Sequence, residues 1–131
     1  MEKQEIKELL EKETGFFKHN NFQFIDCIEG KSAELKVILN DNSYNQYKIA
    51  HGGLLFGLGD HAMGIVASST GRNVVTLNST INYLKPAKGK YLIAKAEMIK
   101  NGKNTCFLRC NIYNDKEEVV TTMDGNYYYI D

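Results

Sequence analysis

One stretch of the sequence brings several reactive residue types close together. Residues 51–64 read HGGLLFGLGDHAMG, and this apolar segment holds two histidines, five glycines and the carboxylate of Asp60. A helix that is apolar on most sides is buried on most sides, and a charged carboxylate there is costly unless it is paired or protonated. Asp60 is therefore either hydrogen-bonded locally or on an exposed strip, or it lines a cleft and takes part in chemistry.

The start of the same segment offers hydrogen-bond donors. His51, Gly52 and Gly53 lie where the expected central helix begins, at about residues 53–69. The first N–H groups of a helix are unpaired and lie at the positive end of its dipole, and such groups can hold a developing oxyanion. Asp60 lies about 12 Å further along the helix, so one chain cannot easily bring both features to one reacting carbon. Two antiparallel copies could, which predicts a dimer with shared sites if this segment is a site.

The elements around this segment indicate one curved sheet. An amphipathic helix is expected at about residues 2–14, with Ile6, Leu9 and Leu10 on one face, and packing on the outside of the domain is preferred to partner binding. Alternating apolar residues predict strands in six segments, FQFIDCIEG, KSAELKVIL, NVVTLNSTINYLK, YLIAKAEMIKNG, NTCFLRCNIYND and EEVVTTMDGNYYYI. The linkers KPAKGK, KNGKN and NDKEE are typical of hairpin turns.

A long helix buried on most sides needs a sheet that curls around it. The sequence therefore predicts an α+β fold, with a curved antiparallel sheet wrapped around one central helix in a single domain of residues 1–131. Gly57, Gly59 and Gly64 each cost this helix roughly 1 kcal/mol relative to alanine. We expect them to allow close approach of the helix to the sheet or to a second copy.

The composition excludes several classes of protein. Of 131 residues, 43% are hydrophobic and 24% charged, and 16 basic residues balance 16 acidic ones. This balance argues against a general nucleic-acid binder. No run approaches the roughly 20 apolar residues of a membrane span, and the N-terminal residues contain no apolar signal core. We expect a cytoplasmic protein with neither a membrane nor a nucleic-acid partner.

The three cysteines are Cys27, Cys106 and Cys110, with no C-x-x-C pair among them. Cys106 and Cys110 stand four apart in an expected strand, which puts their Cα atoms about 13 Å apart, too far for a disulfide. We expect all three to be reduced apolar residues. The sequence has no closely spaced cluster typical of a metal site, so we predict no metal.

Three blocks resemble the hotdog-fold acyl-CoA thioesterases of the phenylacetate-pathway (PaaI-like) type, over roughly residues 20–130. The first is NQYKIAHGG, in which Asn45 stands six residues before His51. The second is HGGLLFGLGDHA, with Asp60 nine residues after the histidine. The third is VVTLNSTINYLKPAKGK, the strand that follows the helix in this family. The resemblance implies the hotdog fold and hydrolysis of acyl-CoA thioesters.

The resemblance also implies roles for individual residues. Asp60 would be the catalytic carboxylate, acting as base on water or as nucleophile. The N–H of Gly52 would polarise the carbonyl, with His51 shaping the turn. Asn45 would orient the thioester or the water, and Thr76 would help to position the water.

Binding of the substrate is expected to involve Gly53 and two basic turns. Lys85 and Lys88, or Lys100 and Lys103, could meet the phosphates of coenzyme A as point charges, although such lysines also occur on solvated turns. The resemblance implies no cofactor beyond coenzyme A as part of the substrate. It implies a homodimer, often a dimer of dimers, whose sites combine Asp60 of one subunit with Gly52 of the other.

The sequence departs from the family pattern at three positions. Lys48 replaces a small residue in the loop before His51. Gly64 stands one turn after Asp60 in place of the hydroxyl residue of some branches, which leaves Thr76 as the main hydroxyl candidate. His61 points about 100° away from Asp60 around the helix, and we assign it no catalytic role.

Two other functions stay open at this point. The same fold hosts ligand-binding modules, so a non-catalytic acyl-CoA-binding protein is one alternative. The other is a dehydratase or hydratase of acyl-CoA or acyl-carrier substrates, in which histidine and a carboxylate move protons on carbon.

Overall fold

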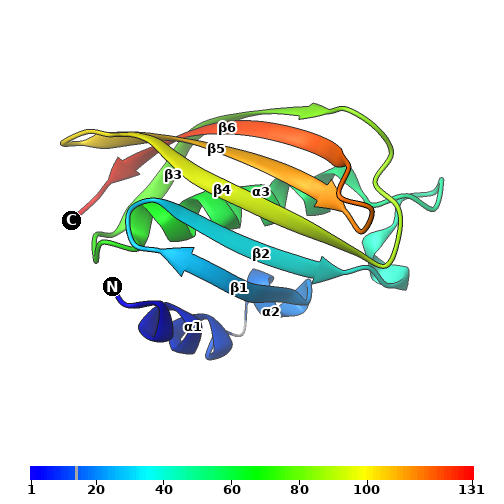
Figure 1. Ribbon diagram of the computed structural model, residues 1–131, viewed down its shortest axis with the longest axis horizontal. Coiled ribbons are helices and arrows are strands. Elements are labelled where there is room, and N and C mark those ends of the chain that lie inside the picture. The colour runs from blue at the N-terminus through cyan, green and yellow to red at the C-terminus, as the bar shows by residue number, and fades with distance from the viewer. Residues whose placement is uncertain (14) are drawn as a thin grey trace.

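Six strands form one antiparallel sheet, and a long helix lies against its inner face (Figure 1). The computed structural model describes residues 1–13 and 15–131; Thr14, the expected end of the N-terminal helix, lies outside the described residues. The elements in chain order are α1 (Lys3–Glu11), α2 (Phe16–His19), β1 (Phe22–Ile28), β2 (Ser32–Ile38), the 3₁₀ helix η1 (Asp41–Ser43), α3 (Gly52–Ser68), β3 (Val74–Tyr83), β4 (Tyr91–Asn101), β5 (Thr105–Asn114) and β6 (Val119–Tyr129). The α+β architecture predicted from the sequence is confirmed.

The order of strands across the sheet is β1-β2-β4-β5-β6-β3. KNGKN and NDKEE join the neighbouring pairs β4–β5 and β5–β6, as predicted. KPAKGK was predicted to be a hairpin turn, and this is wrong: β5 and β6 lie between β3 and β4, so the linker crosses from the edge of the sheet to its middle. Turn-like composition sets a local bend, but it does not decide which strands pair.

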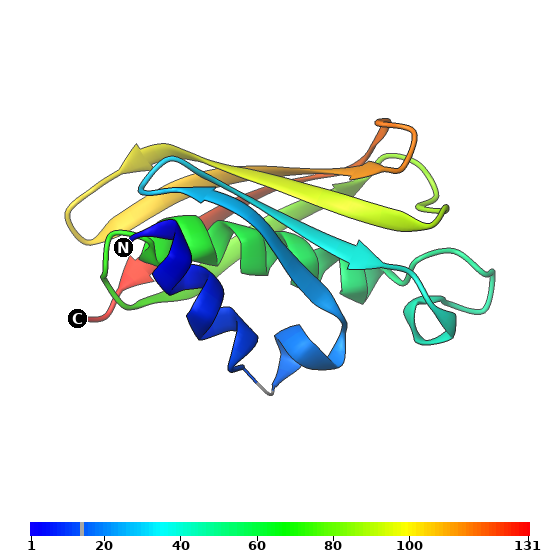
Figure 2. The ribbon, with the colours of Figure 1, turned by 60° about the horizontal axis from the view of Figure 1, so that its bottom comes forward.

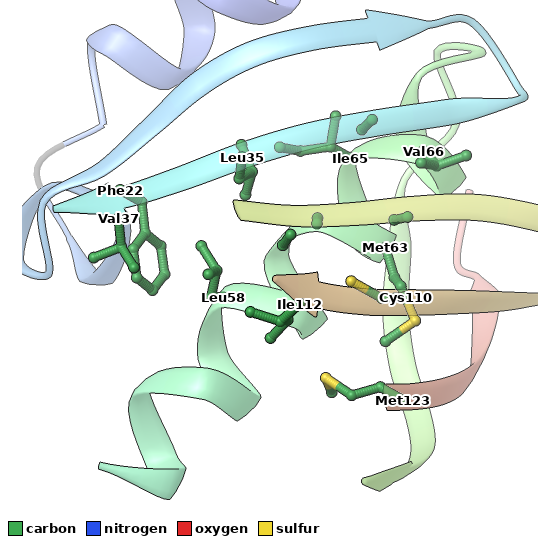
Figure 3. Close-up of a cluster of buried hydrophobic side chains, with 14 of the residues drawn as sticks. Phe22, Leu35, Val37, Leu58, Met63, Ile65, Val66, Cys110, Ile112 and Met123 are labelled. Carbon is green, nitrogen blue, oxygen red and sulfur yellow. The ribbon is translucent and has the colours of Figure 1, made fainter. Parts of the chain in front are cut away.

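Burial of α3 by the sheet makes the core. The helix contacts all six strands, and Leu58, Met63 and Val66 have no exposed surface. Figure 3 shows these side chains in one cluster with residues of the sheet, among them Leu35 and Ile112. On β2 and β4 every second residue is buried, as the alternation in the sequence predicts: Ala33, Leu35, Val37, Leu92, Ala94 and Ala96. The curvature of the sheet follows from enclosing one apolar helix.

The glycines of α3 meet three different surroundings. A Cβ on Gly59 would lie 2.1 Å from Sδ of Met123 on β6, so this glycine allows the expected close approach to the sheet. A Cβ on Gly57 would lie 2.6 Å from the ring of Phe16 on α2. A Cβ on Gly64 would meet no atom within 4 Å among the described residues. Of the three glycines expected to allow a close approach, Gly57, Gly59 and Gly64, only Gly59 therefore lies against the sheet.

The N-terminal helix α1 packs beside β1, on the same side of the sheet as α3 (Figure 2). Ile6 and Leu10 are buried, whereas Leu9 is 56% exposed. The expected apolar face of three residues is thus narrower, because Leu9 and Leu10 point about 100° apart. Lys3 pairs with Asp26 of β1 at 2.8 Å, so α1 is held by burial and by an exposed ion pair.

All three cysteines are unpaired and buried, as expected. Burial raises the pKa of the Cys110 thiol to about 12, so it is a thiol at neutral pH. Over residues 1–13 and 15–131, none of the helices combines the length and the apolar character that crossing a membrane requires.

Candidate active site

The carboxylate of Asp60 is held by two hydroxyl groups. Thr76 Oγ1 donates a hydrogen bond to Asp60 Oδ1 at 2.9 Å, and the Tyr127 hydroxyl donates to the same oxygen at 2.6 Å. Among the described residues, no donor reaches Oδ2. Two donors on one oxygen fix the plane of the carboxylate and leave the other oxygen available to a ligand.

Pairing of β3 with β6 brings the two hydroxyls together. Thr76 and Tyr127 are direct partners across these strands, and the register shifts between Thr76 and Asn78. A bulge bends a strand and redirects side chains. The sheet thus positions both donors against the middle of α3, one from each of two adjacent strands.

Tyr127 is the residue of this group that sequence reasoning missed. The sequence places Tyr127–Tyr129 in the last expected strand, and burial of Tyr127 and Tyr129 agrees with packing there. Nothing local distinguishes the hydroxyl of Tyr127, because its partner is 67 residues away in the chain. Burial, and then the hydrogen bond to Asp60, raise the pKa of Tyr127, so the phenol keeps its proton and acts as a donor.

A groove of about 650 Å³ opens beside Asp60. One side is α3, with His61, Gly64 and Ser68, and the opposite side is formed by β3 and the end of β6. Asp60 itself is half-buried. The carboxylate therefore lines a hollow and does not lie on an exposed strip, which favours the functional one of the two interpretations of Asp60.

The start of α3 forms a second feature. His51 is the N-cap, and its Nδ1 accepts a hydrogen bond from Gly53 N–H at 2.8 Å. The N–H of Gly53, an expected substrate contact, is thus engaged, and no acceptor within the described residues binds the N–H of Gly52. Tyr83, at the end of β3, donates to the Gly52 carbonyl at 2.7 Å. The free donor at the helix start is therefore Gly52 N–H.

Asn45 lies in the loop that leads to this helix start. Its Oδ1 accepts hydrogen bonds from the N–H groups of Tyr47, at 2.9 Å, and Ile49, at 3.4 Å. Lys48 in the same loop adopts a left-handed backbone with φ of 63°. Asn45 and Gly52 line one pocket of about 380 Å³. The Asn45 side chain folds the loop and leaves its amide NH₂ as a donor at this pocket.

Within one chain the two features are separate. Gly52 and Asp60 line different pockets, and eight residues of helix put them about 12 Å apart. Strand β3 contacts both, through Tyr83 at Gly52 and through Thr76 at Asp60. Each chain therefore carries two expected half-sites at separate places. One is Asp60 with its hydroxyl donors, and the other is the start of α3 with the N–H of Gly52.

His61 points away from the Asp60 hydroxyl cluster and into an aromatic cluster. Its ring lies 4.8 Å from that of Phe17 and 6.2 Å from that of Phe22. Its Nε2 is 3.9 Å from a carboxylate oxygen of Glu13. Burial lowers the pKa of His61, against smaller opposite effects of Glu13 and Asp60. His61 thus anchors the N-terminal segment to α3 as a neutral ring.

The two expected basic turns lie at opposite ends of β4. Lys85 lines the Gly52 pocket and pairs with Glu118 at 2.8 Å, and Lys88 is exposed on the same connection. Lys100 and Lys103 are exposed at the other end, about 34 Å away along a strand of this length. One chain does not bring the two turns together.

Comparison with known proteins identifies the family. The profile of the thioesterase superfamily matches residues 47–121, which include Asp60, Gly52 and Thr76. The chain belongs to the thioesterase superfamily. Membership supports hydrolase activity for this chain, and the curved sheet around a long helix is the expected hotdog fold.

Three solved structures resemble this chain. The PaaI protein of the phenylacetic acid degradation operon of Escherichia coli has a TM-score of 0.90 and 26% identity, over 98% of this chain and 92% of that chain. A Streptococcus mutans protein bound to acetyl CoA has a TM-score of 0.81 and 28% identity, over 90% and 95%. A hypothetical thioesterase of Streptococcus pneumoniae has a TM-score of 0.79 and 31% identity, over 84% and 91%.

Two variant structures of the pneumococcal protein allow a comparison of spacing. One replaces an aspartate by alanine and the other a threonine, at positions 16 residues apart. Asp60 and Thr76 of this chain are also 16 residues apart.

Removal of the Tyr127 hydroxyl should lower turnover and leave substrate binding unchanged. In Tyr127→Phe the carboxylate keeps only Thr76 as donor, so its orientation loosens, and we expect kcat for the best thioester substrate to fall about tenfold or more at similar KM. Tyr129→Phe is the matched control. Tyr129 lies on the same strand as Tyr127, but its hydroxyl donates to Asn101 at 2.6 Å instead of to Asp60. Equal losses in both variants would show that Tyr127 has only a structural role.

The stability of the fold should depend on pH through His61. Its folded pKa lies below the unfolded value of 6.5, so the unfolded chain binds the proton more readily. The stabilisation is complete above 6.5 and is lost as pH falls below it. We expect the free energy of unfolding in urea to fall between about pH 7.5 and pH 5.5, and to fall less in His61→Gln. The control is His19→Gln, at an exposed position of α2, which should keep the full decrease in the free energy of unfolding. The same full decrease in His61→Gln would show that His61 is not its cause.

Proposed function

We propose that this protein hydrolyses acyl-CoA thioesters to a free acid and coenzyme A. The observation that carries the proposal is the Asp60 carboxylate, which Thr76 and Tyr127 hold by one oxygen at the edge of a groove. Membership of the thioesterase superfamily supports the reaction class. The bound acetyl CoA of the Streptococcus mutans relative supports coenzyme A as the thiol.

The reaction follows from these groups without a cofactor. Asp60, through the free Oδ2, takes a proton from water as the water oxygen attacks the thioester carbonyl carbon. The carbonyl oxygen becomes an oxyanion and accepts a hydrogen bond from Gly52 N–H, strengthened by the positive end of the α3 dipole. The C–S bond then breaks, and the proton passes from Asp60 to the leaving sulfur. One water is consumed, and a carboxylic acid and a thiol are formed.

The two half-sites require a second copy. The Gly52 N–H that holds the oxyanion belongs to the partner subunit, because about 12 Å of helix separates it from Asp60 of the same chain. Strand β3 is an edge strand of the sheet, and Val75 and Leu77 on it are 45% and 55% exposed. An exposed apolar edge is a template for pairing with another chain. A two-fold axis beside β3 would set each helix start against Asp60 of the other copy.

The same arrangement gives the basic turns a role. Lys85 and Lys88 belong to the Gly52 end of the chain, and Lys100 and Lys103 to the far end of β4. In a two-fold dimer the opposite ends of two chains meet, so lysines from both subunits would flank one coenzyme A. Lys85 is held by Glu118, so Lys88 is the one of these two lysines whose charge is not engaged in an ion pair among the described residues. A dimer of dimers remains the expected higher assembly.

The observations favour hydrolysis over the two alternatives. Proton transfer on carbon by a hydratase would use a histidine beside the carboxylate, but His61 is packed against Phe17 and Phe22, and His51 is engaged as the helix cap. A binding module would need no anchored carboxylate in its groove. The aspartate and threonine chosen for replacement in the pneumococcal relative have the spacing of Asp60 and Thr76, which also supports catalysis.

Asp60→Asn tests the proposal directly. The amide keeps the shape of the side chain but cannot take a proton from water, so kcat for release of thiol from acyl-CoA should fall by about 10²–10⁴. The far-ultraviolet circular dichroism spectrum and the melting temperature should stay close to those of the wild type. Turnover within a fewfold of wild type would contradict the assignment of Asp60.

Mixing of two inactive variants tests the shared site. Gly52→Pro removes the oxyanion N–H, and proline is well tolerated at the first position of a helix. A heterodimer of Asp60→Asn with Gly52→Pro has one site with both defects and one intact site. After unfolding and refolding of an equal mixture, about a quarter of the wild-type activity should return, because half of the dimers are mixed and each has one working site.

Each variant refolded alone is the control and should stay inactive. If the mixture stays as inactive as its components although mixed dimers are detected by mass spectrometry, the site lies within one chain and the dimer model is wrong.

A further inference from the structure

The groove continues well past the catalytic carboxylate. From Asp60 it follows α3 by way of Gly64 and Ser68, and it reaches Leu10 of α1 and Ile130 after β6. The volume of about 650 Å³ lies in the range of pockets that hold whole ligands, roughly 300–1,000 Å³. A two-carbon acetyl group would occupy only the part next to Asp60.

Gly64 keeps this groove open. It lies one turn of helix after Asp60 and faces the groove, and the space where its Cβ would stand is empty to 4 Å within the described residues. A larger side chain would therefore fill the groove instead of colliding with the core. Glycine destabilises the helix by about 1 kcal/mol relative to alanine here, and in return the absence of a side chain leaves the groove open.

The far part of the groove has apolar walls. The side chains beyond Gly64 that line it are mostly branched aliphatic ones, with Ser68 and Asn73 as the polar members: Leu10, Ile65, Val74, Val75 and Ile130. Leu10 comes from α1, so the N-terminal helix closes one wall. An alkyl or aryl group placed here would contact apolar side chains along its length.

The described residues that one chain contributes to the groove offer no cation to an anionic acyl group. Among the described lining residues there is no lysine or arginine, and the titratable ones besides Tyr127 are Asp60 and His61. Glu13 is the further charged group that faces His61. A second carboxylate on the acyl group would lie near Asp60 with no cation to pair with it, which is a repulsive arrangement.

We infer that this groove is the acyl subsite, and that it takes uncharged acyl groups whose chain extends from the carbonyl at Asp60 past Gly64 toward Leu10 and Ile130. The inference rests on the proposed function and adds the substrate class to it. Gly64 and Ser68 would contact successive parts of the acyl chain, because they are four residues, about 6 Å, apart along the helix.

The test is the ratio of kcat/KM values for acetyl-, hexanoyl-, decanoyl- and succinyl-CoA, measured by release of thiol. The wild type should prefer hexanoyl- or decanoyl-CoA to acetyl-CoA and should disfavour succinyl-CoA. Gly64→Leu should lower both the hexanoyl-to-acetyl and the decanoyl-to-acetyl ratios by about tenfold or more, since misfit of single methylene groups costs about 10–200-fold.

Two further variants test whether the effect depends on the position and the size of the added side chain. Ser68→Leu should lower the decanoyl-to-hexanoyl ratio, because it fills the groove one turn later. Gly64→Ala is the graded control, and the fall in its ratios should be smaller than in Gly64→Leu. These are ratios within one variant, so a partial loss of folded protein does not change them.

The outcomes separate this inference from the proposed function. If the wild type releases thiol from none of the four substrates, both fall. If it hydrolyses some of them but Gly64→Leu and Ser68→Leu leave the ratios unchanged, the acyl group lies elsewhere and only the inference is overturned. Preference of the wild type for succinyl-CoA would overturn it as well.

Discussion

Enclosure of one apolar helix by one sheet is the constraint on which this structure depends. Helix α3 contacts all six strands, and burial of its apolar side chains requires the sheet to curl around it. The sheet cannot cover the last side of the helix. The groove that stays open along the helix is lined by Asp60, His61 and Gly64. A polar group can lie in the middle of this helix because the uncovered side offers room and the adjacent strands offer donors.

Hydrogen bonds from the hydroxyls of Thr76 and Tyr127 stabilise the Asp60 carboxylate in its apolar surroundings. A buried polar group is tolerated when its hydrogen bonds are satisfied, and here two paired strands supply one donor each. Both donors bind the same oxygen. The stabilisation of Asp60 and its orientation toward a ligand therefore have the same cause, and a stable fold does not conflict with a reactive group.

Edge strand β3 connects the parts of the proposed site. Through Thr76 it contacts Asp60, through Tyr83 it contacts the carbonyl of Gly52, and its outer edge has no strand beside it among the described residues. Any second copy that pairs with this edge approaches both half-sites at once. Helix α1 lies on the other flank of α3 and reaches the groove through Leu10, so the N-terminal helix contributes to the wall of the groove that α3 and β3 form.

Periodicity along the chain determined most of the fold in advance. The alternation of Ala33, Leu35 and Val37 and the largely apolar character of residues 54–67 depend only on neighbours in sequence, so the strands, the long helix and the curved sheet around it could be predicted. The same local reasoning singled out Asp60 as an anomaly and the glycines of residues 52–53 as donors. Tertiary structure alone decided that KPAKGK crosses the sheet, that His51 engages Gly53 N–H, and that Tyr127 binds Asp60. The crossover and the contact of Tyr127 with Asp60 join residues far apart in the chain. The helix cap depends on the direction of the His51 side chain. The periodicity of the sequence carries no information about distant contacts or about the direction of a single side chain.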